Sequence, residues 1–87
     1  MAKKPVDFTD TFKQNYQRMP FSIQKRFDEK LKLFMENPMH PSLNIHRYNE
    51  IWEGYVTSKY RFTFSSTKEA YLFRNIGPHG IIDKGKV

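Results

Sequence analysis

Two histidines and two arginines in the second half of the chain carry the side-chain chemistry that stands out. His46 opens one segment of β-forming residues, and His79 follows another in the run Gly77-Pro78-His79-Gly80. Arg61 and Arg74 lie inside such segments. Histidine exchanges protons near neutral pH, and arginine binds phosphate and stabilises charge developing on it. These groups suit metal-independent cleavage of RNA, in which the 2′-OH attacks the adjacent phosphate and needs only acid–base and electrostatic help.

A plainer interpretation of the same residues stays open. A histidine in a loop, as at His40, and an arginine on a strand are more often surface groups than parts of a site. The chain has no cysteine, which excludes disulfides, thiol catalysis and zinc fingers. His46 and His79 have no carboxylate at ligand spacing, so we expect no metal site, and no nucleotide-binding motif implies a cofactor.

Length and charge limit the kind of protein further. The 87 residues predict one domain spanning 1–87, and 15 basic against 9 acidic side chains give a net charge of +6. This balance favours nucleic acid as a partner, although many small basic domains bind none. No apolar run approaches the roughly 20 residues of a membrane span, and no apolar stretch follows the first lysines as in a secretory signal. We therefore expect a cytoplasmic protein with no membrane partner.

The elements that position these residues change character near Pro38. Before it, apolar side chains recur at helical spacing, and we expect a first helix ending at Pro20 and capped by Thr9 or Asp10. A second helix is expected from Ser22 to Asn37. The apolar stripes of the two helices are Phe8, Phe12, Tyr16 and Met19, then Ile23, Phe27, Leu31 and Phe34 or Met35. A short strand around residues 5–7 is a weaker expectation.

After Pro38 the residues are β-formers separated by turn residues at 48–50, 58–59 and 65–68. We expect an α+β fold in which the helical hairpin packs on a twisted antiparallel sheet of three or four strands. Alternation along residues 60–64 places Phe62 and Phe64 in the core and Arg61 on the exposed face. Alternation does not orient Arg74, because both faces of its strand are partly apolar. Trp52 fits packing or the stacking of a base.

Six ordered motifs resemble the RelE/ParE superfamily of toxins from bacterial toxin–antitoxin systems, in particular its RelE-, HigB- and YafQ-like branch. They run from about Phe8 to His79, and each by itself is loose. The motifs are Met19-Pro20-Phe21-Ser22-Ile23-Gln24, Asn37-Pro38-Met39-His40-Pro41-Ser42-Leu43, His46-Arg47, Ile51-Trp52-Glu53-Gly54-Tyr55-Val56, Tyr60-Arg61-Phe62-Thr63-Phe64 and Arg74-Asn75-Ile76-Gly77-Pro78-His79.

The resemblance implies a RelE-like fold and a ribosome-dependent endoribonuclease, or mRNA interferase, which inhibits translation. Carried over by position, it implies His79 as general acid and His46 as candidate base. It also implies that Arg61 and Arg74 hold the scissile phosphate and that Arg47 binds the RNA backbone. The implied partners are the ribosome, mRNA and a cognate antitoxin in a hetero-oligomeric complex.

One departure from the family pattern keeps alternatives open. Many active members carry an aromatic residue shortly after the final histidine, and here no aromatic follows His79. Either Tyr48, Trp52 or Tyr55 substitutes, or the nuclease activity is weak. The first alternative function is inhibition of DNA gyrase, as in the ParE branch, which does not depend on this set of residues. The second is a non-catalytic RNA-binding module.

Overall fold

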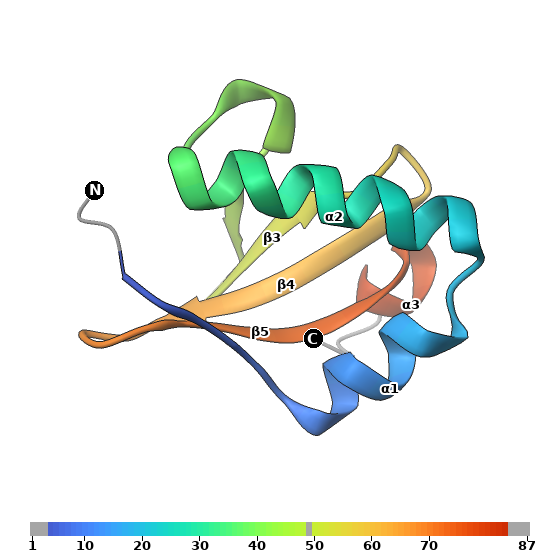
Figure 1. Ribbon diagram of the computed structural model, residues 1–87, viewed down its shortest axis with the longest axis horizontal. Helices are drawn as coiled ribbons and strands as arrows, with labels where there is room; N and C mark the ends of the chain where they lie inside the picture. The colour runs from blue at the N-terminus through green and yellow to red at the C-terminus, as the bar shows by residue number, and fades with distance from the viewer. Residues whose placement is uncertain (1–3, 49, 84–87) are drawn as a thin grey trace.

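The computed structural model describes residues 4–48 and 50–83, with two longer helices lying against a five-stranded sheet (Figure 1). The helices are α1 (Asp10–Arg18) and α2 (Phe21–Glu36), followed by a 3₁₀ turn at Pro41–Leu43. The strands are β1 (Val6–Phe8), β2 (His46–Tyr48), β3 (Ile51–Tyr55), β4 (Tyr60–Ser66) and β5 (Tyr71–Pro78), and a short α3 (His79–Asp83) follows β5. The α+β class is confirmed. No helix of this described part is long and apolar enough to cross a bilayer.

The helical hairpin follows the local signals of the sequence. Thr9 caps α1, since its hydroxyl accepts a hydrogen bond from the backbone N–H of Phe12 at 3.1 Å. Met19 and Pro20 separate the two helices, and α2 ends at Asn37, before Pro38. Phe8 does not belong to the first helix as expected, because it is the last residue of β1.

The sheet is larger than expected, and it is mixed instead of antiparallel. Its order is β1-β5-β4-β3-β2, with β1 parallel to β5 and the other neighbours antiparallel. The short strand expected around residues 5–7 is present as β1, but its place in the sheet was not expected, because three residues are too few to show which strand they pair with. Its partner strand also lies at the other end of the chain, so only tertiary pairing defines it (Figure 1).

A bulge in β5 explains why alternation did not orient Arg74. Thr63 pairs with Asn75 and the next residue, Phe64, pairs with Phe73, so Arg74 is the extra residue opposite them. The bulge shifts the phase of the strand. Phe73 therefore faces the core before it, whereas Ile76 does so after it.

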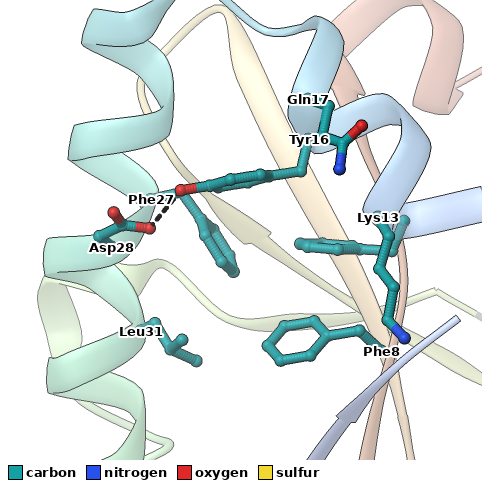
Figure 2. Close-up of a pocket in the computed structure, with 8 residues that line it drawn as sticks. Phe8, Lys13, Tyr16, Gln17, Phe27, Asp28 and Leu31 are labelled. Carbon is teal, nitrogen blue, oxygen red and sulfur yellow. Dashed lines mark hydrogen bonds between the residues drawn. The ribbon is translucent and has the colours of Figure 1, made fainter. Parts of the chain in front are cut away.

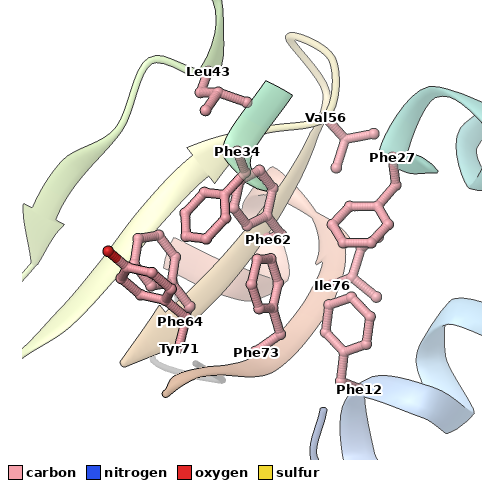
Figure 3. Close-up of a cluster of buried hydrophobic side chains, with 10 residues drawn as sticks. All are labelled: Phe12, Phe27, Phe34, Leu43, Val56, Phe62, Phe64, Tyr71, Phe73 and Ile76. Carbon is pink, nitrogen blue, oxygen red and sulfur yellow. The ribbon is translucent and has the colours of Figure 1, made fainter. Parts of the chain in front are cut away.

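The aromatic core lies between α2 and the sheet (Figure 3). Phe34 meets the rings of Phe64, Tyr71 and Phe73 edge-on, with centroids 4.9–5.1 Å apart. Phe27 is buried as expected, whereas Leu31 is only half-buried. The full buried cluster comprises Phe12, Phe27, Phe34, Leu43, Val56, Phe62, Phe64, Tyr71, Phe73 and Ile76.

The run from Gly77 to Gly80 divides between the end of β5 and the start of α3. Gly77 pairs with Arg61 and Pro78 with Tyr60, so both residues extend the strand. His79 begins α3, and its backbone N–H donates to the carbonyl of Lys59 at 2.7 Å. This bond fixes the start of α3 beside the turn between β3 and β4.

Candidate functional site

The buried polar side chains of the described residues lie on the sheet face opposite the aromatic core. The strand pairings align His46, Glu53, Thr63 and Asn75 in one row across β2, β3, β4 and β5. Side chains alternate along each strand, so this row points away from the layer of Phe62 and Phe64. Glu53, Thr63 and Asn75 are each at most 7% exposed. We call this side of the sheet the polar face.

Arg61 lies on this polar face, but it is buried, where exposure was expected. It is 6% exposed, and its Nη1 donates to the backbone carbonyls of Thr57 and Ser58 in the turn between β3 and β4. Its guanidinium carbon lies 3.6 Å from the centroid of the Tyr55 ring, its cross-strand neighbour. The face of the sheet on which Arg61 lies was therefore predicted correctly. Its burial was not predicted, and it results from contacts within the β3–β4 hairpin.

Glu53 joins Arg61 to His46. Its Oε1 lies 3.5 Å from the Nε of Arg61 and 3.5 Å from the Nε2 of His46. The Nε of Arg61 is buried and makes no hydrogen bond within the described part of the chain. The nearby Glu53 carboxylate therefore offsets part of the cost of burying this group. These three side chains form one cluster, which we call the His46–Glu53–Arg61 cluster.

The second ring nitrogen of His46 also has an oxygen partner. Its Nδ1 lies 3.2 Å from the backbone carbonyl of Asn44, and a carbonyl can only accept. The ring therefore donates from Nδ1, which leaves Nε2 with the lone pair when the imidazole is neutral. Asn44 has a φ of 51°, a left-handed conformation that asparagine tolerates and that aims this carbonyl. His46 keeps 51% of its side-chain surface exposed, so solvent or a substrate can reach it.

His79 and Arg74 lie on the far strand from His46. His79 is exposed at the end of β5, and Arg74 is half-buried at the bulge, where its carbonyl accepts from the Thr9 hydroxyl at 2.8 Å. Three strand spacings, roughly 14 Å, separate the backbones of β2 and β5, and His79 lies four residues beyond Asn75, the residue in the row of His46, which adds roughly 13 Å along the strand. A substrate phosphate would have to lie between the two histidines to meet both.

Arg47 and Trp52 do not share the polar face with His46. They pair across β2 and β3, and the Arg47 guanidinium lies 5.7 Å from the centre of the Trp52 ring. Trp52 also stacks on Phe64 at 6.3 Å and packs against the core. The neighbouring residues His46 and Arg47 were expected to act at one place, yet their side chains leave the edge strand on opposite sides.

An apolar groove of about 300 Å³ opens on the core side, between α1 and α2 (Figure 2). Phe8, Phe12 and Leu31 are among the residues that line it. At its rim the Tyr16 hydroxyl donates to a carboxylate oxygen of Asp28 at 2.8 Å. Burial, and secondarily this bond to Asp28, raises the pKa of Tyr16 to about 12. No histidine or arginine lines the groove, whereas both kinds of side chain lie on the polar face.

Sequence reasoning gave Glu53 no role and considered Tyr55 only as one of three substitutes for the aromatic residue that does not follow His79. Both are odd-numbered, as is Arg61, and strand alternation over 51–55 could have placed them together on one face. Nothing local indicated which residues of the next strand they would meet. Among residues 4–48 and 50–83, no three histidine, aspartate or glutamate side chains gather as a metal ion would require.

The fold, unlike the sequence, has clear relatives. No protein-family model and no curated protein sequence matches this chain. RelE in the RelB–RelE antitoxin–toxin complex of Methanococcus jannaschii superposes with a TM-score of 0.74 at 18% identity, covering 92% of this chain and 98% of the other. For YafQ of E. coli strain BL21(DE3) the values are 0.73 and 11%, with 91% and 97% covered.

A YoeB/ParE toxin from Agrobacterium tumefaciens is also similar, with a TM-score of 0.71 at 13% identity over 86% of this chain and 98% of the other. The RelE-like fold that the sequence motifs implied is thereby confirmed. The chain therefore has the fold of the RelE, YafQ and YoeB toxins.

Proposed function

We propose that this protein is the toxin of a toxin–antitoxin pair and a metal-independent, ribosome-dependent endoribonuclease that inhibits translation by cutting mRNA. The observation that carries the proposal is the His46–Glu53–Arg61 cluster on the polar face of a chain with the RelE/YafQ fold. A reachable imidazole next to a carboxylate–guanidinium pair can take up a proton and stabilise the charge that results.

In the proposed reaction, Nε2 of His46 takes the proton of the RNA 2′-OH. The 2′ oxygen then bonds to the adjacent phosphorus, and the bond from phosphorus to the 5′ oxygen breaks. His79 gives the leaving oxygen its proton, so the products are a 2′,3′-cyclic phosphate and a 5′-OH. No metal or other cofactor takes part in this scheme.

The arginines have different proposed parts. Arg74, half-buried at the bulge, is proposed to bind the scissile phosphate. Arg61 is buried and its Nη1 already donates to two carbonyls, so it is proposed to act on the phosphate through its charge, from within the hairpin. Arg47, exposed on the edge strand β2, is proposed to hold the RNA backbone where it passes that edge.

Tyr55 is our proposed substitute for the aromatic residue that does not follow His79. It lies on the polar face, next to Arg61, and it is half-buried. Trp52 fits less well, because it lies on the other face and packs on Phe64. The side chain of Tyr48, the third alternative, lies outside the described residues.

The proposed partners are a cognate antitoxin, the ribosome and mRNA. Structural neighbours of this chain were crystallised with antitoxins, as in the DinJ–YafQ complex of E. coli and the RelB–RelE complex of M. jannaschii. The net charge of +6 suits an acidic antitoxin segment as well as RNA. We propose a cytoplasmic location on the same basis, because that is where ribosomes and mRNA occur.

Primer extension on a defined mRNA in a purified translation system tests the proposal. We expect the wild type to cut at codons in the decoding site and His79→Gln to lose the cuts. His40→Gln is a matched control, because His40 bonds locally to Ser42 in the loop after α2. Cuts that persist in His79→Gln would move the acid to another residue. Absence of cuts by the wild type would refute the nuclease, and inhibition of gyrase supercoiling would then favour the ParE-like alternative.

A further inference from the structure

We infer that Glu53 is the positioning residue of the polar face, holding His46 and Arg61 in place and stabilising the protonated imidazole when His46 takes up a proton. This inference deepens the proposed function and rests on it. Glu53 stands in one of the sequence motifs, but the motif gave it no role, and only the strand pairing brings it beside His46 and Arg61.

The first argument is the burial of a carboxylate. Glu53 is 5% exposed, and burying a charge is costly unless it is paired. One oxygen, Oε1, lies 3.5 Å from both the Arg61 Nε and the His46 Nε2. Arg61 is itself fixed by two carbonyls and the Tyr55 ring, so it anchors the carboxylate. The carboxylate then presents a fixed negative charge to His46, which is the exposed member of the cluster.

The second argument is the direction of the His46 ring. The Asn44 carbonyl accepts a hydrogen bond from Nδ1–H, so Nε2 is the nitrogen that can accept a proton. When Nε2 takes a proton, the positive charge of the ring lies 3.5 Å from the Glu53 oxygen, which stabilises it. The charged or polar groups facing this ring are thus Glu53 on β3, Arg61 on β4 through Glu53, and the Asn44 carbonyl before β2. Arg47 on β2 points to the other face.

The test compares Glu53→Gln with wild type in two measurements. The first is the rate of mRNA cleavage at neutral pH, which we expect to fall roughly tenfold because the carboxylate no longer holds the ring and offsets its developing charge. The second is ¹⁵N NMR of the His46 ring in the free protein, where we expect Glu53→Gln to lose the single ring orientation with the proton on Nδ1, because the carboxylate no longer lies beside Nε2.

Glu50→Gln is the matched control, since Glu50 is an exposed acid in the turn just before β3, and we expect it to behave like wild type. If Glu53→Gln does not fold, Glu53→Asp serves instead, because the shorter side chain keeps the negative charge but holds it further from His46. We expect the same changes to a smaller extent. Rates and ring spectra that superpose on wild type would overturn the inference, as would a changed ring spectrum with an unchanged rate. Absence of cleavage by the wild type would refute the proposed function alone, because the ring spectrum still tests Glu53.

Discussion

Replacing Arg61 with alanine tests the physical account of the polar face without any assay of function. The substitution removes the guanidinium that donates to the carbonyls of Thr57 and Ser58 and lies beside Glu53. It also removes the cation from the Tyr55 ring, at 3.6 Å from its centroid. Glu53, at 5% exposure, is then left with His46 as its remaining partner.

The expected loss of folding stability follows from the Glu53 carboxylate, which stays buried without its arginine partner. Removing one partner of a buried ion pair destabilises a protein by about 3–5 kcal/mol. Since half-exposed His46 stays beside Glu53, we expect the lower end, about 3 kcal/mol. In a domain of this size such a loss lowers Tm by roughly 12–24 °C.

Urea denaturation followed by the fluorescence of Trp52, the only tryptophan, measures this loss. Lys59→Ala is the control, because Lys59 is an exposed cation in the same hairpin, and we expect a change within about 0.5 kcal/mol. Adding Glu53→Gln to Arg61→Ala should restore part of the stability by removing the unpaired charge. A loss below about 1 kcal/mol in Arg61→Ala would refute the reasoning.

Two further predictions concern the core and its rim. Gly54→Ala should destabilise the fold by about 1–3 kcal/mol in a urea titration, because the added Cβ would lie 2.7 Å from Ile45 Cδ1 and closer still to the Phe62 ring; wild-type stability would show that this packing yields. The Tyr16 pKa of about 12 lies above its ordinary value of 10, so folding favours the protonated phenol. That contribution is complete below pH 10 and lost as the pH rises to about 12, and stability curves over this range should be flatter for Tyr16→Phe; parallel curves would contradict it.

Much of the fold could be predicted because its signals are local. A helical stripe depends on residues three and four apart, and Phe12 and Phe27 are buried as the spacing of α1 and α2 implies. The cap at Thr9 and the end of α2 before Pro38 depend on one or two side chains. Alternation over residues 60–64 likewise placed Phe62 and Phe64 in the core.

The strand partners of β1 and of Arg61 could not be predicted in this way, because pairing depends on segments far apart in the chain. Nothing in residues 6–8 indicates a parallel partner at residues 71–73, and a bulge at Arg74 changes the phase of β5 halfway along. The exposure expected for Arg61 was wrong for a related reason. Alternation gives the face of a side chain, whereas burial depends on what covers that face.

By itself, the sequence determined the helical hairpin, the aromatic core, the basic charge and the motifs that resemble a toxin superfamily. Only the tertiary structure decided that Glu53 lies between His46 and Arg61 and that Arg47 leaves the edge strand on the other side. The physical reason is that residue type and spacing set local conformation, whereas the register between strands sets which charges meet.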